Sequence, residues 1–348
     1  MKAKKILATL IVGAFCVPSL LAVEKKQWTW FHRKQFNDSE QLLNKEKKSL
    51  ATAKTDLPLF TQLVFSWNAF RPHKGHFTFH AQVRNAATKK WSKWHRMMVW
   101  GFTEQKSFKT EPDYMSSYHH VRLETSKTLS ADAFAIKVVA QDGADLSLLK
   151  SFGVNLSNLN EFTHEHESLM AAARSVFVKG VPQYSQFELK HPRNDGLCSP
   201  TSCAMLTSYL MAEHIDPVDF AEKSLDKGLD KYGSWPFNIA HAFERSNGRA
   251  SFAVTRLNSF KNLYDHLCRG IPVGVSVRGN IAGAPRVYHN GHLLVVVGYD
   301  SKTKEVICHD PAVSEAKLGR KRYNLKNFMQ AWERSHRLAY VADPIIQG

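Results

Sequence analysis

The sequence has few cysteines and no long apolar stretch beyond its start. Five cysteines occur among 348 residues, and they form neither CxxC pairs nor the Cys/His spacings of zinc fingers. No later apolar run approaches the roughly 20 residues that a membrane-spanning helix needs. No internal repeat of fixed period and no low-complexity tract is present. These absences argue against a zinc finger, a helical membrane protein, a repeat protein and a largely disordered chain.

The chain is basic but has no basic cluster. Lysine and arginine number 47 against 31 acidic residues, for a formal charge of +16, and the surplus is spread over both halves. An even spread without a basic recognition helix predicts no nucleic-acid partner, and it suits a secreted protein near an anionic cell envelope. The length predicts two domains, and a hydrophobic content of 43% is enough for a core in each.

The start of the chain has the organisation of a signal peptide. Met1 to Lys5 is basic, Ile6 to Val17 is apolar, and charged residues follow Ala22. We therefore expect a secreted or periplasmic mature protein with no stable membrane span. A lipoprotein anchor at Cys16 is the alternative, but Phe15 stands where such sites prefer a small residue.

The two halves differ in their hydrophobic pattern. From about residue 58 to 155 the apolar residues alternate with a period of two, as at Phe77, Phe79 and Val83, which predicts an antiparallel β-sandwich. Leucines at helical spacing predict a helix over 38–53 ahead of it. The polar stretch 155–168 indicates a linker between the domains.

The second half predicts helices followed by an antiparallel sheet, which is an α+β domain. The expected helices cover 198–211, 237–245 and 259–269, and the expected strands cover 272–277, 293–299 and 305–309, the last two joined by a hairpin at 301–304. The predicted organisation is a leader over 1–22, a β-sandwich accessory domain over 23–157, a linker over 158–177 and the α+β domain over 178–348.

Cys198 stands at the start of a predicted helix. Pro200 lies in the first turn of this helix, a position where its missing N–H costs nothing. The free N–H groups and the dipole at a helix N-terminus favour a thiolate, which is the reactive form of cysteine. The alternative is a structural thiol or a disulfide, because export permits disulfides and Cys203, Cys268 and Cys308 are available as partners.

His292 and Asp310 flank the predicted hairpin. Pairing about the loop places residue 310 opposite 292 or 294, so the two side chains lie on the same face of the sheet, adjacent or diagonal. A carboxylate beside an imidazole holds one tautomer and stabilises the cation, as a Cys/His nucleophile pair requires.

A zinc site is the competing interpretation of this segment. His289, His292, His309 and Asp310 are close in sequence and are all possible ligands. In a regular strand His309 points to the opposite face from Asp310, and the HExxH spacing is absent. We therefore expect neither a metal nor any other cofactor.

Four segments of the second half form a known pattern in the order Gln, Cys, His, Asp. They are VPQYSQ at 181–186, CSPTS at 198–202, GHLLVVVGYD at 291–300 and HDP at 309–311. Together they resemble the C39-like cysteine peptidases of the papain-like group over about residues 178–345. The resemblance implies that Cys198 is the nucleophile, His292 the general base and acid, Asp310 the orienting group and Gln186 an oxyanion donor, with Gln183 as the competitor of Gln186.

The resemblance implies a secreted cysteine peptidase or related amide hydrolase acting on a peptide or protein. The segment WPFN at 235–238 also matches, so that Trp235 lines the substrate cleft or is an ordinary core tryptophan. The alternative function is a non-catalytic peptide- or cell-wall-binding protein on a C39-like scaffold.

The first half resembles the sandwich modules that accompany C39-like domains in some secreted bacterial proteins, through SWNA at 66–69 and WSKW at 91–94. If exposed, Trp67, Trp91, Trp94 or Trp100 could stack on sugar rings and contact a cell-envelope glycan. Packing in the sandwich core and between the domains is the favoured alternative.

Overall fold

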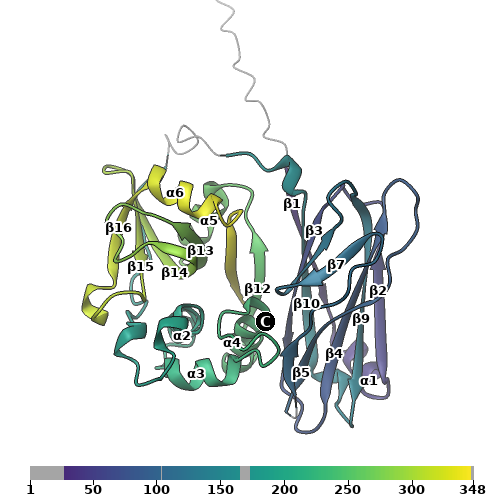
Figure 1. Ribbon diagram of the computed structural model, residues 1–348. Helices are drawn as coiled ribbons and strands as arrows, with labels where there is room; N and C mark the ends of the chain where they lie inside the picture. Colours follow the sequence, from purple (N-terminus) through teal and green to yellow (C-terminus); the bar gives the residue numbers. More distant parts are fainter. Residues whose placement is uncertain (1–26, 103, 165–172, 346–348) are drawn as a thin grey trace, which may run out of the picture.

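The computed structural model describes residues 27–102, 104–164 and 173–345. In these ranges the chain forms two halves that lie side by side, one made of strands and one of a sheet with helices around it (Figure 1). The leader and Cys16 lie outside the described residues. Within them, no helix has the length and apolar character needed to cross a membrane.

The first half contains two five-stranded antiparallel sheets. One has the order β1-β10-β3-β8-β7, with bounds Thr29–Gln35, Leu149–Ser157, Gln62–Ala69, Arg122–Thr125 and Ser116–His119. The other has the order β2-β9-β4-β5-β6, with bounds Ser49–Lys54, Ala131–Gln141, His76–Asn85, His95–Gly101 and Gln105–Ser107. Side chains of both sheets share one hydrophobic cluster, in which the ring centroids of Phe65 and Phe79 lie 5.2 Å apart.

The helix expected over 38–53 is wrong in its second half. Helix α1 covers only Asp38–Lys45, and the chain then continues as β2, with Leu50 opposite Val138 of β9. Leu42 and Leu43 are mostly exposed, so a longer helix would have had no apolar face to bury. In β2, by contrast, Leu50 and the other inward residues are partly covered with a period of two.

The linker expected over 155–168 begins too early. Residues 155–157 complete β10, and their polar character is explained by buried hydrogen bonds: the Asn155 amide donates to Thr29 Oγ1 at 2.9 Å, and the Ser157 and Thr29 hydroxyls lie 3.0 Å apart. At the other end, β11 (Val176–Phe177) pairs with β14 of the second half. Part of the predicted linker, 165–172, lies outside the described residues.

The second half is built on one seven-stranded sheet. Its order is β12-β17-β13-β14-β15-β16, with bounds Ala250–Arg256, Leu338–Pro344, Val273–Gly279, Tyr288–Asp300, Glu305–His309 and Arg320–Asn324, and β11 pairs with β14 beside this path. Its helices are α2 (Cys198–Met211), α3 (Pro217–Ser224), α4 (Trp235–Arg245), α5 (Phe260–Cys268) and α6 (Leu325–Glu333). The predicted helices and the 301–304 hairpin are confirmed as α2, α4, α5 and β14–β15, whereas α3 and α6 were not anticipated.

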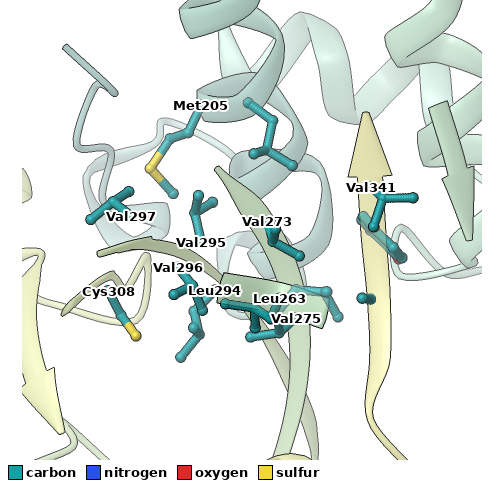
Figure 2. Packing of buried hydrophobic residues seen from close by; sticks show 14 of the residues in the cluster. Met205, Leu263, Val273, Val275, Leu294, Val295, Val296, Val297, Cys308 and Val341 are labelled. Atoms are coloured by element: carbon teal, nitrogen blue, oxygen red, sulfur yellow. The ribbon is translucent and has the colours of Figure 1, made fainter. Parts of the chain in front are cut away.

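The core of the second half forms where helices pack on the middle of this sheet. Met205 of α2 and Leu263 of α5 belong to one cluster with the valines of β13 and β14, including Val273 and Val295 (Figure 2). This packing holds the N-terminus of α2 beside β14. The position of Cys198 relative to the sheet is therefore set by the hydrophobic core.

Strand β3 joins the two halves, because it is buried on both faces. Leu63, Phe65 and Trp67 belong to the core of the first half, whereas the alternate residues face β12. Three N–H groups of β12 donate to side-chain oxygens of the first half: Phe252 to Asn68 (2.8 Å), Val254 to Ser66 (3.3 Å) and Arg256 to Asn155 (3.2 Å). The outer edge of β12 is thus covered by polar side chains and not by another strand.

Two of the four candidate sugar-stacking tryptophans are core residues. Trp67 and Trp100 are fully buried, and the Trp67 ring lies edge-on to Phe237 of α4 with centroids 5.6 Å apart. Packing in the core and between the halves is therefore confirmed for this pair. Trp91 and Trp94 are half-buried.

Candidate active site

Cys198 is the first residue of α2, directly after the short helical turn Asn194–Gly196 and Leu197. The backbone N–H groups of Leu293 and Ser199 lie close enough to its sulfur to help lower the pKa of the thiol, and the residue is partly exposed. The disulfide alternative is not realised, since Cys198, Cys203, Cys268 and Cys308 are all free. Cys203 and Cys308 are buried, so Cys198 combines access to solvent with donors directed at its sulfur.

His292 lies on β14 next to an irregularity in the sheet. Val277 of β13 pairs with His292 and Gly279 pairs with Tyr288, so three residues of β14 stand opposite one residue of β13. Gly291 lies in this bulge with φ of +89°, a conformation that favours glycine. The bulge brings the rings of Tyr288 and His292 into a stack, with centroids 4.2 Å apart and planes 10° apart. In a regular strand, residues four apart are separated by roughly 13 Å.

Asp310 directly follows β15 and contacts the imidazole. His292 Nε2 donates to Asp310 Oδ1 at 2.7 Å, and both side chains are buried. Val295 pairs with His309, so continuing the pairing by one step places Asp310 opposite Leu294 and diagonal to His292, one of the two registers expected from the sequence. Asp310 also accepts from the Ala312 N–H at 2.9 Å.

His292 connects the sulfur to the carboxylate. The Cys198 thiol and the His292 ring interact, since each shifts the pKa of the other toward the charged form, and Nε2 of the ring is bound to Asp310 at 2.7 Å. Because Nε2 faces the carboxylate, Nδ1 is the nitrogen available to the sulfur. The structure thus brings together the three residues singled out from the sequence.

The pKa values at these three residues all shift toward their charged forms. Burial opposes ionisation of the Cys198 thiol, but the His292 ring and the two backbone N–H groups outweigh it and lower its pKa. Burial also opposes the imidazolium, yet the charge and hydrogen bond of Asp310, together with Cys198, raise the pKa of His292 to about 10. The pKa of Asp310 is lowered despite its burial, chiefly by His292. These directions favour a thiolate–imidazolium pair beside a carboxylate.

Gln186 is placed differently from an oxyanion donor. Its side-chain Nε2 donates to the carbonyls of Asn194 and Asp195 at 2.8 and 2.9 Å, and its backbone N–H donates to Pro311 O at 2.8 Å. Both amide hydrogens are therefore occupied, and one bond would have to break to free a donor. These contacts tie the turn before Cys198 to the segment after Asp310. The competitor Gln183 is half-buried, and its Oε1 has no hydrogen-bond partner within the described residues.

Trp235 begins α4 at the junction of the two halves. Its ring is half-buried, packs against the hydrophobic clusters of both halves and lies 5.9 Å from the Arg122 guanidinium of β8. These contacts describe a packing residue between the halves. Its expected contact with substrate stays a prediction.

The possible zinc ligands are directed elsewhere. His309 Nδ1 donates to Pro182 O at 3.0 Å, and burial lowers the pKa of His309 to about 4. His289 is exposed, and His292 is bonded to Asp310. Within the described ranges no three His, Cys, Asp or Glu side chains are grouped so that they could hold a metal ion.

Two tyrosines at this site were missed by the sequence reasoning. Tyr288 and Tyr323 both donate their hydroxyls to Asp310 Oδ2, at 2.6 and 2.9 Å. Tyr288 lies four residues before His292 on β14, a distance at which regular strand geometry excludes contact, and Tyr323 belongs to β16, which was not predicted. The glycine directly before His292 was the one available signal for a bulge.

The comparisons with known proteins place the similarity in the second half of the chain. Residues 178–340 match the model of the family described as "Peptidase_C39 like family". A crystal structure from Bacillus anthracis, of a protein described as a C39-like peptidase, has 18% sequence identity and a TM-score of 0.38, and the match covers 49% of this chain and 98% of that one. Xylellain, a cysteine protease from Xylella fastidiosa, has 14% identity and a TM-score of 0.30, covering 53% of this chain and 91% of its own. TM-scores this low carry no argument of their own. Among curated proteins none matches the sequence.

Proposed function

Because residues 178–340 match the model of the Peptidase_C39 like family, we propose that this chain is a cysteine peptidase, or a related amide hydrolase, in which Cys198 attacks the substrate carbonyl. One observation carries the proposal: His292 is hydrogen-bonded to the buried carboxylate of Asp310 and interacts with the Cys198 thiol, so that the pKa of the thiol is lowered and that of the ring is raised. This is the arrangement that an activated thiol nucleophile requires.

In the first step the Cys198 thiolate forms a bond to the amide carbonyl carbon, and negative charge develops on the carbonyl oxygen. In this proposal the backbone N–H groups at the N-terminus of α2 stabilise this charge, and one such donor is worth roughly 3 kcal/mol in the transition state. Gln186 would add a second donor only after its side-chain bond to Asn194 or Asp195 breaks, and Gln183 is the competing donor.

In the next steps the imidazolium of His292 protonates the leaving amine as the C–N bond breaks, which produces a thioester on Cys198. His292, now neutral, removes a proton from water, which attacks the thioester and releases the acid and the thiolate. Asp310 keeps the ring oriented through both transfers and stabilises its charged form.

The setting of this chemistry is also part of the proposal. The two facing sheets with one shared core support a β-sandwich accessory domain ahead of a papain-like catalytic domain. The leader supports secretion, and a peptide or protein is the expected substrate. A glycan contact through the first half is restricted to Trp91 and Trp94, since Trp67 and Trp100 are buried.

The decisive experiment compares Cys198→Ala with Cys268→Ala, a free and exposed cysteine that serves as the matched control. Both variants and the wild type are incubated with a proteome-derived peptide library, and cleavage is read by mass spectrometry. We expect Cys198→Ala to lose cleavage and Cys268→Ala to keep it. Hydrolysis by Cys198→Ala at more than a few per cent of the wild-type rate would contradict the proposed nucleophile.

Iodoacetamide labelling at neutral pH separates the enzyme from the alternative of a binding protein on the same scaffold. A thiol activated by His292 should be alkylated well before Cys203, Cys268 and Cys308. Sluggish labelling of Cys198, together with peptide binding and no cleavage, would favour the binding protein.

A further inference from the structure

Two hydroxyl groups converge on one oxygen of the Asp310 carboxylate. We propose that Tyr288 and Tyr323 are positioning residues that keep Asp310 ionised and keep the His292 ring aligned between the carboxylate and the sulfur. The inference rests on the proposed function, because it concerns the same site. It assigns a role to two residues that neither the sequence pattern nor the family match singles out.

The first argument is the number of donors to a buried charge. Asp310 is 1% exposed, so without donors its carboxylate would take up a proton. His292 Nε2 and the Ala312 N–H donate to Oδ1, whereas the hydroxyls of Tyr288 and Tyr323 donate to Oδ2. The two tyrosines therefore supply half of the hydrogen bonds of this carboxylate.

The second argument is the division of labour between the two oxygens. Hydroxyl donors stabilise the carboxylate without introducing a second cation that would compete with the imidazolium of His292. Because both hydroxyls bind Oδ2, the carboxyl group is prevented from rotating, and Oδ1 stays directed at the imidazole. The tyrosines approach from two different strands, β14 and β16, which restrains the carboxylate from two sides.

The third argument is the ring stack. The bulge at residues 289–291 interrupts the regular pairing of β13 and β14. As a result, the Tyr288 ring lies flat on the His292 ring. The stack restricts the plane of the imidazole while Asp310 holds one of its nitrogens. Tyr288 thus contacts both members of the Asp–His pair.

The titratable groups that face Asp310 come from three strands: His292 and Tyr288 from β14, Cys308 from β15 and Tyr323 from β16. Burial and the neighbouring Asp310 raise the pKa of each tyrosine, so both hydroxyls stay protonated and remain donors. Burial likewise raises the pKa of the Cys308 thiol, which stays neutral. The charge state of the site therefore depends on Asp310, His292 and Cys198.

The test measures the rate of Cys198 alkylation by iodoacetamide as a function of pH in Tyr288→Phe, Tyr323→Phe and the double variant. With fewer donors Asp310 takes up a proton at a higher pH, and the neutral acid no longer supports the imidazolium that stabilises the thiolate. We expect the acid limb of the profile to move upward by on the order of one pH unit for each hydroxyl removed. Where a cleaved peptide is available, kcat should fall while KM changes little.

The matched control is Tyr209→Phe on α2. This change removes a hydroxyl that donates to the Gly270 carbonyl at 2.8 Å, and it leaves Asp310 untouched. Its acid limb should coincide with that of the wild type. Thermal melts show that the single variants are folded, and these variants suffice if the double variant is not. An acid limb that stays within about 0.2 pH unit of wild type in both folded single variants would overturn the proposal.

Alkylation needs no substrate, so the two proposals fail separately. If the wild type cleaves no peptide but the acid limb of alkylation moves in the tyrosine variants, the peptidase proposal is overturned and the positioning role is supported. If the wild type cleaves peptides but the acid limb does not move in the tyrosine variants, the peptidase proposal is supported and the positioning role is overturned. If the alkylation rate of wild-type Cys198 depends on pH as that of an ordinary thiol does, both proposals are overturned, because no ion pair is then present to be positioned.

Discussion

The two edges of the seven-stranded sheet are protected in opposite ways. At one edge β16 has the sequence RKRYN, with Arg320, Arg322 and Asn324 exposed to water. At the other edge β12 has the sequence ASFAVTR, and every residue in it is buried. Charged side chains on an edge strand discourage pairing with another chain, so β16 carries its protection within its own sequence. β12 has no such protection and obtains it from the first half of the molecule.

The difference separates the tasks of the two regions. The inward residue of β16, Tyr323, reaches Asp310 and so belongs to the site. The outward N–H groups of β12 donate to Asn68, Ser66 and Asn155, so this edge belongs to the junction between the halves. Changes near β16 should therefore affect reactivity, and changes near β12 should affect stability.

The largest expected effect is at the site. Asp310→Asn removes the charge that supports the imidazolium, and we expect turnover to fall on the order of 10⁴-fold, by analogy with the corresponding substitution in serine triads. Turnover is measured on a cleaved peptide, with circular dichroism as a check of the fold. Asp300→Asn is the control, because this partly exposed carboxylate on the same hairpin binds Arg322 and no residue of the triad. A loss smaller than tenfold in Asp310→Asn would mean that another residue orients His292.

The next effect is the pH dependence, which should follow the site and not the junction. Because the pKa of His292 is raised to about 10, kcat/KM should fall about tenfold per pH unit above that value as the imidazolium is lost. The same shift has a consequence for stability. The folded pKa lies above the ordinary value of 6.5, so this contribution is fully present below pH 6.5 and is lost as the pH rises through about 10.

Urea unfolding of the wild type and Asp310→Asn across this pH range checks the stability part. The variant should lose most of the dependence on pH, since the carboxylate that raises the pKa of His292 is gone. If the free energy of unfolding depends on pH in the variant as it does in the wild type, this pH dependence arises from other titrating groups.

The smallest effect on activity, with a clear effect on stability, is expected at β12. Asn68→Ala leaves both the N–H and the carbonyl of Phe252 without their side-chain partner, since the Asn68 amide binds both. We expect the free energy of unfolding to fall by roughly 2–4 kcal/mol, with an unchanged pH profile of Cys198 alkylation. Lys321→Ala on β16 is the control and should stay within about 0.5 kcal/mol of wild type. Equal losses in the two variants would remove the distinction between the edges.

Local patterns carried much of the prediction. Pro200 and the apolar face marked α2 with the bounds that the structure has, and the valine-rich strands around 301–304 marked the hairpin that places Asp310 diagonal to His292. Cys198 and Asp310 could be chosen because they lie at the start of α2 and directly after β15, whereas His292 lies within β14, just before the apolar run 293–297 that local sequence specifies.

What was missed depends on contacts between distant parts of the chain. Asn68 and Phe252, for example, are 184 positions apart, so no local pattern shows that β3 is buried on both faces. Leu50 was assigned to a helix because the partner strand that captures β2, Ala131–Gln141, lies far along the chain. Tyr288 was overlooked because its contact with His292 exists only through a bulge, and a bulge follows from strand pairing and not from a period in the sequence.

The polar face of β3 also bears on the order in which the protein is made. The first half is synthesised before β12, and until then water takes the place of the β12 N–H groups at Ser66 Oγ and Asn68 Oδ1, while the side-chain amides of Gln62 and Asn68 already bind Glu124 and Ser151 of the first half. Water satisfies such side chains well, and Val64, which packs into the core of the second half, is the apolar residue among Gln62, Val64, Ser66 and Asn68 on this face. An apolar docking face would have exposed the nascent protein to aggregation until the last strands arrived. The polar groups at this junction are hydrated until β12 is made, and they then bind its N–H groups.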